Sequence, residues 1–283
     1  MTARRLAGLG AALIALGCAS KSERPPPPTC LGNCGLSPGL GSGLPSDQGG
    51  GGSQGEGGSS GTSSKGVELT GKVLILNDDL DPSTGALLTD SVDLKSEGAT
   101  GKTVTGFWDG SDDFSIKGVR VATPVWVLAT PRNAVADDAL PAVEPVRTDS
   151  PDAAGQVEVN LALVHSSTIE HVFDLATVPI TPDPGKAQVV LLLVKKDTSV
   201  AEPPPLPGVK VTASSAEDVF YGASAAFSDV ATETDATGAV VLANVPAAVW
   251  PGAEISVEFS GAKSGGAQVR AVNGAVTVAT LPL

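Results

Sequence analysis

The first residues that could do chemistry are the two histidines, His165 and His171, which lie on either side of Glu170. A zinc-protease helix carries two histidines four residues apart on one face, with a glutamate as general base. A spacing of six residues turns the second histidine away from the first, so we expect surface histidines here. No Ser, His and Asp set and no phosphate-binding glycine loop is recognisable elsewhere. The sequence therefore predicts a protein that is not an enzyme and has no catalytic residues; an unrecognised secreted hydrolase is the remote alternative.

Two acidic clusters could supply oxygen ligands to Ca²⁺. They consist of Asp78, Asp79 and Asp81 in one loop and of Asp109, Asp112 and Asp113 in another. Neither cluster has the ligand spacing of an EF-hand loop, and carboxylates are ordinary residues of solvated turns. We expect no metal site and no cofactor, with calcium at these loops as the alternative.

A carbohydrate-binding surface is a further alternative, because a few large aromatic side chains could stack on sugar rings. They are Trp108, Trp126, Trp250, Phe220 and Tyr221. Aromatic residues make up only 4% of the chain, so these side chains are needed to fill hydrophobic cores, and we expect burial. A binding loop would most naturally lie in the long excursion from Ala216 to Asp229.

The N-terminus has the layout of a secretory leader. Arg4 and Arg5 precede an apolar run that is too short for a permanent membrane span, and Ala15-Leu16-Gly17-Cys18 closes this run. The closing tetrapeptide resembles a bacterial lipobox. The resemblance implies removal of residues 1–17 and lipid attachment at Cys18, and the residues that follow favour the outer membrane. An ordinary secretory leader with a coincidental cysteine is the alternative.

Residues 18–66 are rich in Pro, Gly and Ser and have almost no apolar side chains, which predicts a long disordered tether. A flexible chain of this length spans on average about 35 to 40 Å. Cys30 and Cys34 lie inside it, and in an oxidising compartment we expect a local disulfide between them, with a metal site as the alternative.

The charge of the chain restricts its partners. The formal net charge is -13, and removal of Arg4 and Arg5 with the leader leaves 16 basic against 31 acidic residues, a net charge of -15. Such an anionic surface excludes nucleic acid as a plausible partner. We expect the membrane, through the lipid anchor, and other envelope proteins or polysaccharide.

Gly 34, Pro 22 and short alternating apolar segments predict a mainly β chain after Val67. Residues 67–185 form a first predicted module and residues 186–283 a second, because Thr181-Pro182-Asp183-Pro184-Gly185 cannot continue a helix or a central strand. Residues 67–76 read as one strand. Apolar residues at helical spacing predict one amphipathic helix within Gln156–Ala176, capped by Asn160 and packed on the first module.

The second module contains the most informative stretch, Pro207 to Val245. Leu206-Pro207-Gly208-Val209-Lys210-Val211 alternates as a strand, and Thr234-Asp235-Ala236-Thr237-Gly238 is a turn before a buried strand that ends at Asn244-Val245-Pro246. This stretch resembles the carboxypeptidase regulatory-like, transthyretin-like sandwich domains, which are close to bacterial Ig-like surface modules. The resemblance implies two small Greek-key β-sandwich modules and an accessory role without an active site.

Two further patterns concern the topology. The turn Asp109–Asp113 with the strand after it echoes the turn at Asp235, which suggests an internal repeat of about 120 residues. Asn273-Gly274 between two apolar segments is a strong hairpin signal, so we expect residues 268–272 and 275–279 to pair and the C-terminus to end inside a sheet.

Overall fold

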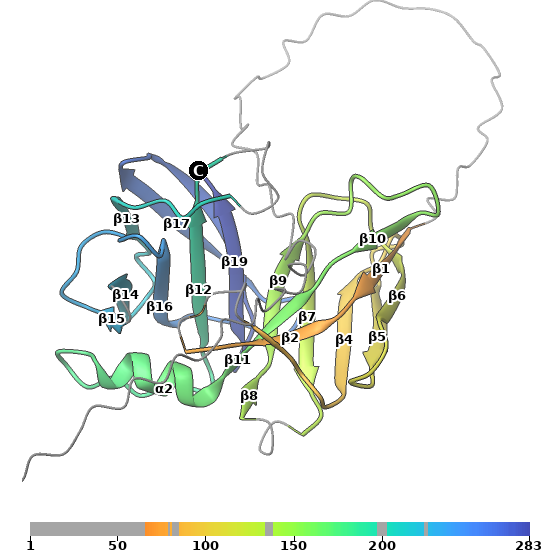
Figure 1. Cartoon of the computed structure of the whole chain (residues 1–283), viewed down its shortest axis with the longest axis horizontal. Coiled ribbons are helices and arrows are strands. Elements are labelled where there is room, and N and C mark those ends of the chain that lie inside the picture. The colour runs from red at the N-terminus through yellow and green to blue at the C-terminus, as the bar shows by residue number, and fades with distance from the viewer. Residues whose placement is uncertain (1–65, 79, 81–84, 134–137, 197–202, 224–225) are drawn as a thin grey trace, which may run out of the picture.

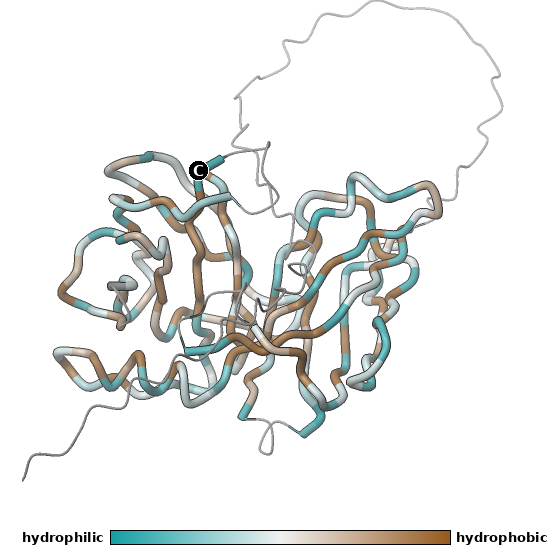
Figure 2. Tube along the Cα trace, viewed as in Figure 1, coloured by the Kyte–Doolittle hydropathy of each residue, from teal (hydrophilic) through white to brown (hydrophobic). Residues whose placement is uncertain are grey.

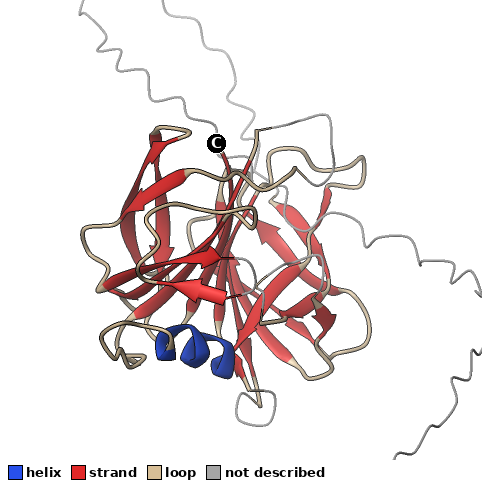
Figure 3. Ribbon diagram, turned by 60° about the vertical axis from the view of Figure 1, so that its left-hand side comes forward, coloured by secondary structure: helices blue, strands red, loops and turns tan. Residues whose placement is uncertain are grey.

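The computed structural model describes residues 66–78, 80, 85–133, 138–196, 203–223 and 226–283 (Figure 1). Strands dominate these residues, and the one helix among them is α2 (Ser166–Asp174), as Figure 3 shows. The predicted mainly β fold with packed sheets and one short helix is confirmed. The leader, lipid attachment at Cys18, the tether and the pairing of Cys30 with Cys34 lie outside the described residues and stay predictions.

One twelve-stranded sheet, called the long sheet below, runs through the described body (Figure 1). From edge to edge its strands are β10 (Gln156–Glu158), β1 (Val67–Gly71), β6 (Phe114–Val119), β5 (Thr103–Trp108), β4 (Val92–Glu97), β7 (Val125–Pro131), β9 (Ala142–Val146), β19 (Val276–Pro282), β12 (Ala187–Val194), β16 (Ala239–Val245), β14 (Asp218–Ala223) and β15 (Ala226–Ser228). Residues 66–185 are called the first half below and residues 186–283 the second half.

Two small sheets cover opposite faces of the long sheet. The first-half sheet has the order β3 (Ala86–Leu87), β2 (Val73–Leu76), β11 (Leu161–His165) and β8 (Ala139–Leu140), and the second-half sheet has the order β13 (Val209–Thr212), β17 (Ala253–Gly261) and β18 (Gly265–Ala271). Along β7, Trp126 and Leu128 pack in the core under the second-half sheet, whereas Val125 and Val127 pack in the core under the first-half sheet. Alternation along one strand therefore supplies two separate cores.

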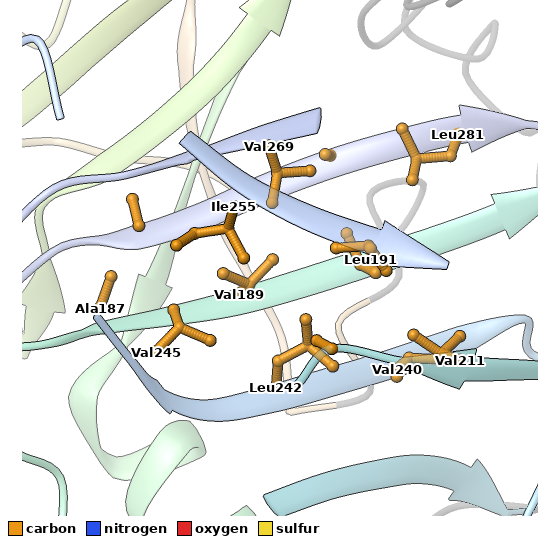
Figure 4. Packing of buried hydrophobic residues seen from close by; sticks show 14 of the residues in the cluster. Ala187, Val189, Leu191, Val211, Val240, Leu242, Val245, Ile255, Val269 and Leu281 are labelled. Carbon is orange, nitrogen blue, oxygen red and sulfur yellow. The ribbon is translucent and has the colours of Figure 1, made fainter. Parts of the chain in front are cut away.

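The core under the second-half sheet is built from side chains of facing strands. Figure 4 shows Val189 and Leu191 of β12 lying against Ile255 of β17 and Val269 of β18. Figure 2 shows that the central strands β12 and β19 are hydrophobic along most of their length, as expected for strands buried on both faces.

The two halves are joined by backbone hydrogen bonds. β19 pairs in parallel with β9 through Val276 with Ala142 and Thr277 with Val143, and it pairs in parallel with β12 on its other side. The long sheet is thus continuous across the predicted boundary at residue 185. The C-terminal strand lies inside this sheet, as predicted.

The predicted strand 67–76 divides into β1 and β2 because the chain changes sheets at Lys72. β10 pairs in parallel with β1 and β11 pairs in parallel with β2, so the segment from β10 to β11 changes sheets beside Lys72. The backbone N–H of Val159 donates to the Thr70 carbonyl at 2.8 Å, and that of Leu161 donates to the Lys72 carbonyl at 2.9 Å. The Asn160 side-chain oxygen accepts from the Lys72 N–H at 3.1 Å. The place where β1–β2 and β10–β11 both change sheets, called the double crossing below, therefore keeps its backbone hydrogen bonds. The Asn160 side chain makes one of these bonds and does not cap a helix.

The predicted helix within Gln156–Ala176 is too long. β10 and β11 occupy residues 156–158 and 161–165, and helix begins only at Ser166. Leu161–Val164 are buried on both faces and pair with β2, and short apolar runs of this kind suit a buried strand as well as a helix. The helix also packs beyond the first half, because Phe173 stacks on Phe220 of β14 with ring centroids 5.7 Å apart.

The predicted hairpin at Asn273-Gly274 is wrong. The turn exists, with the Ala275 N–H donating to the Val272 carbonyl at 3.0 Å, but β18 pairs with β17 and β19 pairs with β12 and β9. Gly274 has a positive φ of 68°, whereas Asn273 is not among the described non-glycine residues with positive φ. The turn therefore lacks the geometry of a two-residue hairpin, and it moves the chain from one sheet to another.

The suggested repeat finds support in local geometry. In each half the first strand of the long sheet pairs in parallel with the last, β1 with β10 and β12 with β19. The Asp109 carboxylate accepts from the backbone N–H and hydroxyl of Ser111, and the Asp235 carboxylate accepts from the same groups of Thr237. The strand before the turn differs in its pairing, since β5 lies next to β6 whereas β14 separates β15 from β16. The similarity thus covers the parallel strand pair of each half and the turn that precedes β6 or β16.

Gly71 is required at the double crossing. Its φ is 147°, and a Cβ there would lie 1.8 Å from the Val159 carbonyl oxygen. We predict that Gly71→Ala lowers the free energy of unfolding by about 3 kcal/mol, measured by urea denaturation. Gly101→Ala is the control, because Gly101 also has positive φ but nothing lies within 4 Å of the added Cβ. An equal loss in both variants would contradict a steric role for the crossing.

Candidate functional site

The described chain brings one Ser, His and Asp group together, at the start of α2. The Asp138 carboxylate accepts from the hydroxyls of Ser166 and Ser167 and, at 3.3 Å, from the Ser167 N–H. The His165 Nδ1 lies 3.9 Å from Asp138 Oδ2. The hydroxyl donors of the two serines hold the pKa of Asp138 below its usual range. All three residue types of a hydrolytic triad are therefore present.

The hydrogen bonds of this group are those of a helix cap. In a triad the serine hydroxyl bonds to histidine and the histidine bonds to the carboxylate, whereas here both hydroxyls bond directly to the carboxylate. His165, the N-cap residue, makes no side-chain capping bond, so Asp138 supplies the anion that a helix N-terminus favours. Glu170 and His171 lie exposed further along α2, and the structure does not gather them with His165 into a site.

The acidic loops make turns and tie elements together. The Asp109 carboxylate closes its own turn, and the Asp112 carbonyl accepts from Trp108 Nε1 at 2.5 Å. Asp78 accepts from the hydroxyl of Thr168 in α2 at 2.7 Å. No group of three or more His, Cys, Asp or Glu side chains that could hold a metal ion occurs in the part of the chain that the structure describes. Asp79 and Asp81 lie outside that part.

Most aromatic side chains that were candidates for a sugar platform are buried. Trp108, Trp126, Phe220 and Tyr221 are each at most 6% exposed, and only Trp250 is half-buried. The binding loop expected within Ala216–Asp229 is occupied largely by β14 and β15. These residues therefore do not form the platform that the sequence suggested.

The residues that carry the domain resemblance hold the second half together. The Thr234 hydroxyl accepts from the Val209 N–H at 3.0 Å and donates to the Leu206 carbonyl at 2.8 Å. Gly238 has a positive φ of 65°, and a Cβ there would lie 2.3 Å from the Leu193 carbonyl oxygen. These two motif positions thus fasten β13 and β12 to the turn that precedes β16.

Asn244 is the most highly bonded of these motif residues. Its side-chain oxygen accepts from the Asp183 N–H at 3.0 Å and from Gln188 Nε2 at 2.9 Å. Its side-chain nitrogen donates to the Thr181 carbonyl and to Glu217, both at 3.0 Å. Asn244 is only 3% exposed and has a positive φ of 48°, a backbone conformation that Asn tolerates well. It anchors the segment between the halves to the long sheet.

We predict that Asn244→Ala lowers the free energy of unfolding by about 3 kcal/mol, because the Gln188 amide and the Asp183 N–H lose a buried partner. Urea denaturation measures this loss. Asn273→Ala, at an exposed Asn in the turn between β18 and β19, is the matched control and should change stability little. Similar losses in the two variants would refute the anchoring role.

Glu144 of β9 is a carboxyl group between the long sheet and the first-half sheet. It accepts from the backbone N–H of Ala162 in β11. The two residues of β8 pair only with Val164 and His165 of β11, so β8 does not extend to Ala162. Burial raises the pKa of Glu144 to about 8, so the group is mostly protonated at neutral pH. The Glu144 carboxyl group therefore bonds a backbone N–H of β11 that no strand residue of β8 pairs with.

This raised pKa predicts a pH dependence of stability. Between the unfolded pKa near 4.5 and the folded value of about 8, unfolding releases a proton, so the contribution of Glu144 to stability falls as pH rises through this window. Glu144→Gln keeps an acceptor for Ala162 and stays neutral. We predict equal stability of variant and wild type below pH 4.5 and a gain of up to about 4 kcal/mol for the variant above pH 8.

Urea denaturation across this pH range measures the difference. Glu158→Gln, at an exposed glutamate in β10, is the control and should leave the pH profile unchanged. A Glu144→Gln profile parallel to wild type would show that Glu144 titrates normally in the folded chain.

The described residues also leave one sheet face uncovered. This face, called the open face below, consists of Asp93 and Lys95 of β4, Thr105 and Phe107 of β5, and Ser115 and Lys117 of β6. Lys95 pairs with Leu128 of β7, and Leu128 lies in the core under the second-half sheet. The open face is therefore on the same side of the long sheet as the second-half sheet, beyond the part that this sheet covers. It combines hydroxyls, charges and an aromatic ring on paired strands.

Phe107 is the residue of this face that the sequence reasoning overlooked. It is 43% exposed, and the Arg132 guanidinium lies 4.2 Å from its ring centroid while bonding to Asp93 at 2.7 Å. Alternation along residues 103–108 was the available signal, because burial of Trp108 turns Phe107 to the other face.

The border of the open face is a junction between the halves. Arg270 of β18 pairs with Glu97 of β4 and lies 5.7 Å from the Trp126 ring centroid, and Arg120 pairs with Glu97 at 2.5 Å. Trp250 Nε1 donates to the Thr103 hydroxyl at 3.3 Å. The open face thus ends at a polar border that the second half supplies.

No protein-family model and no curated protein matches the chain. Among solved structures, it is similar to the minor pilin of the Gram-positive pathogen Streptococcus agalactiae, with 10% identity, coverage of 77% of this chain and 96% of the pilin chain, and a TM-score of 0.22. At this TM-score the two backbones do not superpose as a whole, so the likeness supports neither a fold nor a function. No helix among the described residues is long and apolar enough to cross a lipid bilayer.

Proposed function

We propose that this chain is a non-catalytic, lipid-anchored protein of the cell envelope, which acts as a binding or structural component. The observation that carries the proposal is the sequence of residues 1–17, which has the layout of a secretory leader and stands before Cys18 and a long stretch rich in Pro, Gly and Ser. This order places a β body on a tether at a membrane, with the outer membrane as the favoured site.

The use of the polar side chains supports a non-catalytic role. Asp138, Ser166 and Ser167 are engaged at the start of α2, and Asn244 and Thr234 bond the strands of the second half. The long sheet joins both halves through β9 and β19, which suits a component that must keep its shape.

Labelling with radioactive palmitate tests the anchor. Wild-type chain should incorporate label and fractionate with the outer membrane, whereas Cys18→Ala should lose both properties. Cys34→Ala is the control, because this cysteine lies in the predicted tether and should not affect lipidation. Unlabelled wild-type chain in the cytosol would overturn the proposal.

Polysaccharide is the second candidate partner, and Phe107 favours it. The Phe107 ring is 43% exposed beside the hydroxyl of Thr105, and the Arg132 guanidinium lies against one face of the ring, so the remaining ring surface and the Thr105 hydroxyl offer a stacking contact and a hydrogen-bonding group. Affinity electrophoresis in gels that contain envelope polysaccharides tests this. Phe107→Ala should weaken the affinity for the polysaccharide about tenfold and so reduce the retardation of the protein in the gel. Leu87→Ala is the control, since Leu87 is 53% exposed but lies in β3, away from the open face. Equal retardation of both variants and wild type would exclude the open face.

A further inference from the structure

The open face carries an excess of positive charge in a strongly acidic chain. Its two lysines, Lys95 of β4 and Lys117 of β6, are exposed, and Arg132 lies over the ring of Phe107. The one acidic residue of the open face, Asp93, is bonded to Arg132. The whole chain has 31 acidic against 18 basic residues, so the local excess is opposite in sign to the overall charge.

Strand pairing places the two lysines on either side of one hydroxyl. Lys95 is the pairing partner of Thr105 across β4 and β5. On the other side of β5, Phe107 pairs with Ser115 of β6. In an antiparallel pair, two residues back along one strand correspond to two residues forward along the other, so Thr105 faces Lys117. Lys95, Thr105 and Lys117 therefore form a row across three neighbouring strands, called the basic row below.

Both lysines of the basic row can reach one anion above its centre. Neighbouring strands lie about 4.8 Å apart, so the Cα atoms of Lys95 and Lys117 are about 10 Å apart. A lysine side chain is long and flexible, and its ammonium group has three donors. A negatively charged oxygen group above Thr105 would accept hydrogen bonds from both ammonium groups and from the hydroxyl between them.

The neighbouring carboxylates leave these ammonium groups available. Glu68 of β1 lies 3.9 Å from Lys117 Nζ, but its oxygens accept from the Ser115 hydroxyl at 2.5 Å and from Gln156 Nε2 at 3.1 Å. The Lys117 side chain stays 79% exposed. No carboxylate among the described residues lies within 4 Å of the Lys95 ammonium group. The basic row therefore offers two cations to a ligand.

The basic row and the Phe107 ring together favour one class of ligand. Thr105 and Phe107 are two residues apart on β5, a distance of about 7 Å. A sugar ring stacked on Phe107 therefore brings an acidic substituent of the same polymer above the basic row. A lipid surface fits less well, because Phe107 is the one large apolar side chain exposed on the open face, and membrane binding needs a broad apolar area.

We infer that the open face binds an anionic polysaccharide. Phe107 stacks on a sugar ring, and Lys95, Lys117 and the Thr105 hydroxyl hold an acidic group of the polymer. The inference rests on the polysaccharide candidate of the proposed function and names its chemical class. It does not depend on the lipid anchor.

Surface plasmon resonance with immobilised polygalacturonate tests the class, because this polymer carries a carboxylate on every ring. Its methyl ester has the same backbone without the charge. The full chain with Cys18→Ser, which lacks the proposed lipid site, should bind the charged polymer, and it should bind the ester at least about tenfold more weakly. High ionic strength should weaken binding to the charged polymer, since exposed charges are screened.

Variants of the basic row test the position of the site. Lys95→Gln and Lys117→Gln should each weaken binding to polygalacturonate about threefold, and the double variant about tenfold, as expected for exposed ion pairs. Lys210→Gln is the matched control, because Lys210 is also an exposed lysine on a strand but lies in β13 of the second-half sheet. It should leave the affinity unchanged. Circular dichroism verifies that each variant is folded.

The possible failures are distinguishable. Equally tight binding of the ester, weakened by Phe107→Ala but not by the lysine variants, would overturn the inference and leave a neutral polysaccharide as the partner. Absence of binding to both polymers would overturn the inference and its polysaccharide candidate, while palmitate labelling tests the lipid anchor separately. An equal loss in Lys210→Gln, or binding to vesicles of anionic lipid without binding to polygalacturonate, would also overturn it.

Discussion

The parallel pairing of β19 with β9 and β12 is the interaction on which the rest of the structure depends. β19 is the last strand of the chain, yet it lies between the two halves and is bonded to both. Because β9 also pairs with β7, the ladder continues through the first half without a break. The body is therefore one sheet with local coverings, in which the C-terminal strand bridges the two halves.

A sheet of this length needs coverings on both faces, and polar side chains help to hold these coverings in place. Asn244 fastens the connecting segment, Thr234 fastens β13, and Asp138 fixes the start of α2. Asn244 and Thr234 are buried and satisfy backbone groups that would otherwise be buried without partners, which costs about 1 to 3 kcal/mol per group, whereas Asp138 is partly exposed. The residue types that suggest chemistry in the sequence thus serve mainly to join secondary-structure elements.

Incomplete coverage determines which surfaces remain available for partners. The second-half sheet ends at β18, above the junction of Arg270 with Glu97, and leaves the open face beside it. The same termination leaves β18 without a strand partner on its outer side among the described residues. Both features follow from one topological fact, namely that the second-half sheet has only three strands against twelve in the long sheet.

Local sequence patterns determined much of this molecule. Alternating apolar residues predicted most strands, and the Thr234-to-Gly238 turn before a buried strand was recognisable because it needs a polar side chain and a glycine at set positions. These features depend on backbone geometry within a few residues, which neighbouring side chains control.

Tertiary structure decided what those patterns left open. Leu161–Val164 are apolar on both faces and could be helix or strand until β2 pairs with them. The turn at Asn273-Gly274 brings two strands close in sequence, yet each finds a better partner in a different sheet. Exposure of Phe107 depends on where the second-half sheet, formed by residues distant in sequence, stops. Pairing between strands far apart in sequence is a competition among many possible partners, and only the folded chain as a whole resolves it.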